Sequence, residues 1–304
     1  MRPAFSIIFF TTSSGLGLGL AAWIVLGLMD FSSASQLVMT AIITLGLIGA
    51  GLLSSTFHLG HPERAWRALS QWRSSWLSRE GVLAVAVMAG LTAWFAHVFL
   101  GGTPPMWSNL LLVLLLVATV YATSMIYASL KTVARWHHPL TPVCYLMFAA
   151  AGGLLGVLWL LAMTGQAVSA ALSQATLLLL ASAWGVKLVW WRLAGSAGSG
   201  SSLASATGLG GFGEVRSLMP PHTSENYLQH EMGFIVARRH AAKLRVIALG
   251  LGAALPLLLV GLLPTSGAVM GVALASHVAG VMVERWLFFA EAKHVVSLYY
   301  GAAH

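Results

Sequence analysis

Residues 108–130 read SNLLLVLLLVATVYATSMIYASL, a run of 23 residues without one charged side chain. The hydrocarbon core of a bilayer is about 30 Å thick, and a helix needs roughly 20 apolar residues to cross it. The apolar residues of this run are continuous instead of alternating, so it does not resemble a strand of a membrane β-barrel. It therefore predicts a transmembrane α-helix, because a helix satisfies its own backbone hydrogen bonds inside lipid.

Seven other runs of comparable length and composition occur along the sequence. They are residues 6–28, 36–57, 81–99, 141–163, 170–191, 246–263 and 267–290. Eight spans of roughly 22 residues occupy about 176 positions, which leaves little sequence for a water-soluble domain. Residues 1–304 are therefore predicted to be an all-α integral membrane protein, a single bundle of eight transmembrane helices.

The composition excludes a soluble enzyme. Charged residues make up 8% of the protein and hydrophobic residues 58%, with a mean hydropathy of +0.83. A soluble protein carries about 25% charged residues, and so few charges cannot cover a water-exposed surface. Cys144 is the single cysteine, so no disulfide within the protein and no cysteine-bound iron–sulfur or zinc site is expected.

The basic residues are distributed unevenly between the connections. The odd-numbered connections contain Asp30 and no lysine or arginine, whereas the even-numbered ones hold nearly all of the 16 Lys and Arg. The positive-inside rule then places both termini and the even connections in the cytoplasm. A net charge of +8 is thus interpreted as a topology signal and not as affinity for nucleic acid, although a basic face can also dock an acidic partner.

Two cytoplasmic segments, 58–79 and 193–242, are long enough to do more than connect helices. The first is the densest polar and aromatic cluster in the sequence, with His58 at the end of the second span and Glu80 at the start of the third. A short reentrant loop would bring both side chains to one pocket at the membrane surface. A histidine and a carboxylate there, near Trp66, Trp72 and Trp76, could bind a quinone head group and exchange protons with it.

The same residues also have a purely structural explanation. Interfacial tryptophans form an ordinary aromatic belt, and the arginines can simply mark the cytoplasmic side. Ser78 could cap the third helix, with Glu80 favourably placed in its first turn. In the second segment a helix is predicted over 225–244, and its purely structural interpretation is a solvated or interfacial amphipathic helix.

Few other polar residues lie within the spans. Lys187 and Arg192 are expected to extend to the cytoplasmic surface, while Glu284 and Arg285 are expected to face the bundle interior or a partner. His97 and His277 do not lie at matching depth, so neither haem b nor a metal site is expected. The outer half of the bundle has almost no acidic residues, which disfavours a proton pump. A transporter remains an alternative.

Several of these segments resemble one known family. The string from His58 to Ala65, HLGHPERA, and the string from Ser75 to Glu80, SWLSRE, are similar to the signature of the membrane anchor subunit of dimethyl sulfoxide reductase and its relatives. Further similarities lie in the fourth span with the connection after it and in the last span. They are Tyr127-Ala128-Ser129, Thr132-Val133, Trp136, Thr141-Pro142, Gly280, Arg285 and Phe288-Phe289.

The resemblance implies a heterotrimer, or a dimer of heterotrimers, in a bacterial inner membrane. A catalytic subunit with molybdenum-bis(pyranopterin) and a subunit with 4Fe–4S clusters would be the partners, and this anchor would exchange electrons with ubiquinone or menaquinone. In the family the matching histidine and glutamate are tied to quinol binding. The residues expected to bind the quinone are His58, Arg64, Trp76, Ser78, Arg79 and Glu80. The arginines expected to dock the iron–sulfur subunit are Arg67, Arg73, Arg135, Arg238 and Arg239.

Residues 220–241 resemble one branch of the family, the cytoplasmic-facing sulfite dehydrogenase (quinone) complex. This branch agrees with the charge pattern and implies that electrons from sulfite oxidation reach the quinone. Two alternatives stay open: an anchor of an exported dimethyl sulfoxide reductase-type complex that oxidises menaquinol, and a purely structural anchor. The anchor does not touch the substrate of its partner, so its sequence reports that substrate only by association.

Overall fold

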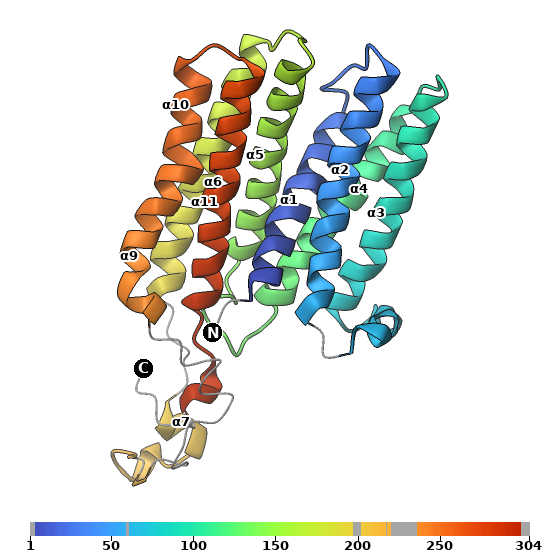
Figure 1. The fold of residues 1–304 in the computed structure, drawn as a ribbon. Helices are drawn as coiled ribbons and strands as arrows, with labels where there is room; N and C mark the ends of the chain where they lie inside the picture. Colours follow the sequence, from blue (N-terminus) through green and yellow to red (C-terminus); the bar gives the residue numbers. More distant parts are fainter. Residues whose placement is uncertain (1–3, 59–60, 197–201, 217, 220–235, 299–304) are drawn as a thin grey trace.

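The protein folds as a bundle of long helices in a computed structural model that describes residues 4–58, 61–196, 202–216, 218–219 and 236–298 (Figure 1). Eight helical stretches among these described residues are long and apolar enough to cross a membrane, so the predicted all-α membrane fold is confirmed. Six are single helices, followed by a composite seventh span and α11. They are α1 (Phe5–Val25), α2 (Ala34–Ser54), α3 (Trp76–Phe99), α4 (Met106–Ala128), α5 (Leu140–Met163), α6 (Ala170–Ser196), then α9 (Val236–Leu249) with the π-helix η4 (Gly250–Ala254) and α10 (Leu255–Leu262), and α11 (Gly267–Ala290).

Short helices occupy the connections. They are η1 (Ser55–His58), η2 (Pro62–Gln71), α7 (Leu203–Thr207), η3 (Gly210–Phe212) and η5 (Val295–Leu298). The helix predicted over 225–244 begins, within the described part of the protein, at Val236, and residues 220–235 lie outside the described residues.

Most predicted spans match to within a few residues, but α3 begins earlier than the predicted residue 81. The Ser75 side chain accepts a hydrogen bond from the Ser78 backbone N–H at 3.4 Å, which caps the helix and lets Trp76 start it. Ser75 is therefore the cap, and the alternative assignment of the cap to Ser78 was wrong. As a result Ser78, Arg79 and Glu80 lie on the first turns of a helix and not in a loop.

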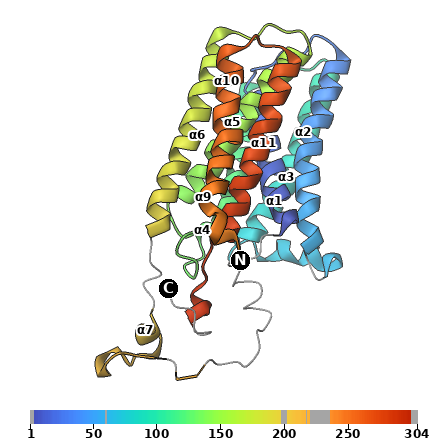
Figure 2. The same ribbon diagram turned by 60° about the vertical axis from the view of Figure 1, so that its left-hand side comes forward.

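The helices connect so that the basic residues meet at one end of the bundle. We call this the basic end, formed by η2, the 129–139 connection and the start of α9. It lies at the bottom of the bundle in Figures 1 and 2, where α1 also begins. The connections at the opposite end, 26–33, 100–105, 164–169 and 263–266, contain Asp30 and no lysine or arginine.

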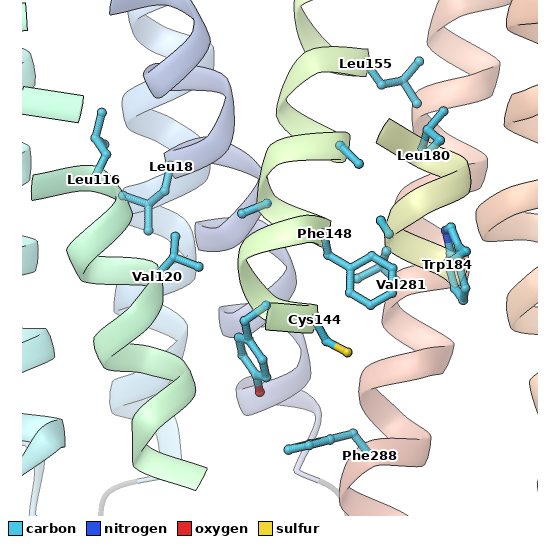
Figure 3. Packing of buried hydrophobic residues seen from close by; sticks show 14 of the residues in the cluster. Leu18, Leu116, Val120, Cys144, Phe148, Leu155, Leu180, Trp184, Val281 and Phe288 are labelled. Carbon is cyan, nitrogen blue, oxygen red and sulfur yellow. The ribbon is translucent and has the colours of Figure 1, made fainter. Parts of the chain in front are cut away.

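Helix α1 is the centre of the bundle and packs against α2, α4, α5 and α11. Its crossing with α5 depends on glycines, because a Cβ on Gly19 would lie 1.8 Å from the Ala149 carbonyl oxygen. Small residues let membrane helices approach closely enough for dense packing. Figure 3 shows the apolar side chains that fill the spaces around this crossing, including Leu18, Val120 and Phe148.

A buried ion pair lies among the apolar side chains. Lys187 of α6 is paired with Glu284 of α11, and their side chains are 1% and 0% exposed. The expectation that Lys187 extends to the surface was therefore wrong, because the carboxylate of Glu284 supplies an internal partner. Arg285 Nη1 lies 3.4 Å from Glu284 Oε2, and Lys187 Nζ lies 3.5 Å from the centre of the Trp190 ring.

Replacing Lys187 by Met is expected to lower the free energy of unfolding by about 3–5 kcal/mol, because removal of one partner leaves a buried charge poorly compensated. Thermal or denaturant unfolding of the purified protein in detergent measures the effect. Lys243→Met, at an exposed position, is the matched control and is expected to unfold like the parent protein. Equal stability of the two variants would contradict the structural role of the pair.

Candidate functional site

Glu80 is the carboxylate on which the predicted quinone site depends. It lies on α3 near the basic end and is 5% exposed, so its carboxyl group faces the interior of the bundle. Its Oε1 is hydrogen-bonded to the hydroxyl group of Thr123, on the neighbouring helix α4. The same Thr123 hydroxyl lies 3.0 Å from the backbone oxygen of Thr119, one turn earlier.

The Thr123 hydroxyl group can serve both protonation states of Glu80. A hydroxyl has one proton to donate and lone pairs to accept with. When Glu80 is ionised, Thr123 donates its proton to the carboxylate. When Glu80 is protonated, Glu80 donates to the Thr123 oxygen, and Thr123 donates to the Thr119 carbonyl. The geometry thus keeps the buried carboxyl group paired before and after it exchanges a proton.

Ser78 and Arg79 fasten the preceding segment onto α3. The Ser78 hydroxyl donates to the Ala68 carbonyl, in η2. The Arg79 guanidinium donates to the carbonyl oxygens of Trp72 and Arg73 at 3.0 and 2.7 Å. Both side chains therefore have hydrogen-bond partners within the described residues. Their predicted contact with a quinone remains a proposal.

Aromatic side chains surround this first turn of α3. The Arg79 guanidinium lies 4.2 Å from the centre of the Trp76 ring, and Trp76 packs edge-on against Tyr121 at 5.8 Å between ring centres. Arg64 is largely exposed, 3.7 Å from the Glu63 carboxylate. His58 ends η1, and its side chain lies outside the described part of the structure, so its predicted approach to Glu80 stays a prediction.

The arginines predicted to dock a partner differ in their surroundings. Arg67 and Arg73 are exposed, and each guanidinium lies over a tryptophan ring, at 5.5 Å from Trp66 and 5.7 Å from Trp72. Both tryptophans are also exposed. The pair of arginines therefore presents positive charge on the outer surface of η2 and of the turn that follows it. Two further candidates, Arg238 and Arg239, lie on α9 with side chains outside the described structure.

Arg135 has an internal partner, which argues against its predicted docking role. Its Nη2 lies 2.9 Å from Glu291 Oε2, and its side chain is only 15% exposed. Arg245 binds the other carboxylate oxygen of Glu291 at 2.5 Å. Burial lowers the pKa of Arg135, against the opposing effect of the nearby Glu291 carboxylate. This three-residue cluster joins the 129–139 connection to α9 and α11, a fastening role that the sequence pattern did not reveal.

The histidines considered for haem lie in different parts of the bundle. His277 lines a small cavity between α1, α4, α5 and α11, whereas His97 lines a separate cavity of about 350 Å³ between α3 and α4. The described residues contain no group of three or more His, Cys, Asp or Glu that could hold a metal ion. A haem bound by both histidines does not fit this arrangement.

Comparisons with known proteins agree with this architecture. Residues 1–301 match the family described as DMSO reductase anchor subunit (DmsC). The protein is 32% identical to the C subunit of sulfite dehydrogenase from Allochromatium vinosum, over 99% of both sequences. It is also 25% identical to the C subunit of anaerobic dimethyl sulfoxide reductase from Haemophilus influenzae, over 49% of this sequence and 55% of that one. The same subunit from Escherichia coli is 32% identical over 38% and 41%. The protein therefore belongs to the DMSO reductase anchor subunit family.

Proposed function

We propose that this anchor subunit passes electrons between an iron–sulfur partner and membrane quinone, in a molybdopterin-dependent complex that oxidises sulfite. The match to the sulfite dehydrogenase anchor along nearly the whole sequence supports this branch of the family. The matches to dimethyl sulfoxide reductase anchors extend over half of this sequence or less, so an exported reductase that oxidises menaquinol is the weaker alternative.

The observation that carries the proposal is the Glu80–Thr123 pair. Conversion of a quinone to a quinol adds two electrons to the ring and one proton to each carbonyl oxygen. A purely structural anchor has no need for a buried carboxyl group that stays paired in both protonation states. A proton-exchanging residue has that need, because an unpaired polar group inside a membrane is costly.

The other residues of the site are proposed to hold the quinone beside Glu80. His58 and Arg64 would donate hydrogen bonds to the carbonyl oxygens, and Trp76 would flank the ring. Ser78 and Arg79 would keep this turn of α3 in place through their bonds to residues 68–73. The electrons would come from the nearest iron–sulfur cluster of the partner.

The basic end is proposed as the docking face, and the cytoplasm as its side of the bacterial inner membrane. Arg67 and Arg73 are the two described docking candidates with exposed guanidinium groups, and complementary charge steers partners and fixes their register. Arg238 and Arg239 would extend this face along α9. The positive-inside rule then gives cytoplasmic termini and a cytoplasmic partner.

Glu80→Gln is expected to lower quinone-linked turnover by roughly 10²-fold or more, because it removes the proton-exchanging group while keeping the size of the side chain. The measurement is sulfite-driven reduction of a short-chain quinone by membranes that carry the whole complex. Reduction of an artificial dye by the partner subunits should stay unchanged. Normal quinone reduction in this variant would refute the site.

Thr123 gives a graded version of this experiment. Thr123→Val removes the hydroxyl at nearly the same volume and is expected to slow quinone-linked turnover, whereas Thr123→Ser keeps the hydroxyl and is expected to restore most of it. His58→Gln is expected to behave like Glu80→Gln. If Thr123→Val matched Thr123→Ser in turnover, the hydroxyl would have no part in the reaction.

The double variant Arg67→Gln/Arg73→Gln is expected to weaken association of the soluble subunits with the membrane by about tenfold at low salt, because it removes two exposed charges. The double lysine variant keeps the charge and serves as the control. The salt concentration that releases the partner subunits from washed membranes measures the effect. Release from the parent and from both variants at the same salt would exclude this surface as the docking face and leave it as a lipid contact.

A further inference from the structure

A small cavity lies between α1, α4, α5 and α11. We call it the inner chamber, and the residues of its wall that matter here are Thr12, Thr123, Tyr145, Gly152, His277 and Arg285. Its volume is about 30 Å³. A water molecule needs about 10–15 Å³ by this measure, so the inner chamber has room for about two or three waters and none for a quinone ring.

Residues that line the inner chamber carry buried polar atoms that need partners. Thr12 Oγ1, Tyr145 OH, His277 Nε2 and Arg285 Nη1 are buried, and none has a hydrogen-bond partner among the described residues. Arg285 Nη1 lies 3.4 Å from the Glu284 carboxylate without forming a hydrogen bond to it. Dry cavities in proteins have apolar walls, whereas buried water occurs where two to four polar groups converge.

The orientation of His277 determines which hydrogen bonds a molecule in the inner chamber must make. Its Nδ1 lies 2.7 Å from the backbone oxygen of Gly252, and a carbonyl oxygen only accepts, so Nδ1 carries the proton. Nε2 of the neutral ring is then an acceptor, in a wall that also holds donors on Thr12, Tyr145 and Arg285. A water molecule can donate to His277 and accept from two of these donors at once, because it has two protons and two lone pairs.

The π-helix η4 fixes that orientation. Gly252 belongs to η4, and the neighbouring carbonyl of Leu251 accepts a hydrogen bond from Ser276 at 2.6 Å. Two successive side chains of α11, Ser276 and His277, thus bond to two successive carbonyl groups of the π-helix. Such interruptions of α-helical pairing recur at functional sites.

We propose that the inner chamber is an internal water site that positions the Glu80 carboxyl group through Thr123. Thr123 connects the two, since it lines the chamber and its hydroxyl bonds to Glu80. Water in the chamber gives the Thr123 oxygen a further partner as Glu80 gains or loses its proton. The role of Glu80 rests on the proposed function, whereas the presence of the water does not.

Two glycines on one face of α5 provide a matched pair of variants. A Cβ on Gly152 would lie 3.4 Å from His277 Nε2 and 3.2 Å from Leu16 Cδ1, so Gly152→Ala takes space from the inner chamber. A Cβ on Gly156, four residues later, would lie 3.3 Å from Leu20 Cδ1, and Gly156 does not line the chamber. Both substitutions crowd one leucine methyl group to a similar degree, but only Gly152→Ala takes space from the inner chamber.

The water is tested by radiolytic hydroxyl-radical labelling of the whole complex, in which bound water oxidises the side chain beside it. Tyr145 is buried, so its labelling reports chamber water, and the buried Tyr127, which does not line the chamber, is the internal reference. Labelling of Tyr145 is expected in the parent protein and in Gly156→Ala, and is expected to fall severalfold in Gly152→Ala. Absence of Tyr145 labelling in the parent protein would overturn the proposal.

The link to Glu80 is tested by the pH profile of quinone-linked turnover. Gly152→Ala is expected to shift this profile, and Gly156→Ala is expected to leave it in place. If the two variants had identical profiles although Tyr145 is labelled in the parent protein, the link between the water and Glu80 would be overturned. If Glu80→Gln leaves turnover unchanged, the proposed function fails. Tyr145 labelling still decides whether the inner chamber holds water. Should Gly152→Ala not assemble, Thr12→Val removes one chamber hydroxyl at similar volume and is expected to reduce the labelling in the same way.

Discussion

Polar groups inside a lipid bilayer need partners that the lipid cannot supply, and this constraint governs the molecule at every level. It makes the eight spans helical, because only helices pair all of their backbone groups within one segment. It holds Lys187 against Glu284 far from water. It also explains why Glu80 sits beside a hydroxyl of α4 that is itself bonded to a carbonyl, where either protonation state of the carboxyl group finds a partner.

The fold could be predicted from the sequence because its signal is continuous and local. Long uncharged runs locate the helices, and the uneven placement of arginine and lysine indicates which connections share one end. The start of α3 was missed because one capping serine, Ser75, extends the helix through a stretch with mixed polarity. Lys187 was misplaced because its partner lies almost a hundred residues later, and no local pattern indicates the pair.

The site could be predicted only in part, for the same reason. The motif around Glu80 marks the carboxylate and its position at the basic end. Thr123 lies 43 residues away in the sequence and resembles any other hydroxyl that an apolar run tolerates. The only signal in the sequence was that Thr123 lies four residues after Thr119, and this spacing does not indicate a contact with Glu80. The sequence indicates that Arg135 is an exposed basic residue, because its partner Glu291 is distant in the sequence and contacts it only in the folded protein.

The central place of α1 has a consequence for biogenesis. Residues 11–14 of this helix, Thr-Thr-Ser-Ser, are all buried, and α1 packs against α5 and α11 as well as α2. Synthesis proceeds from the N-terminus, so α1 enters the membrane long before residues 140–163 and 267–290 exist. Until those helices arrive, Thr11 and Ser14 can bond to carbonyl groups of α1 itself and Ser13 to Leu47 of α2. The packing around α1 is therefore complete only when α11 has been inserted.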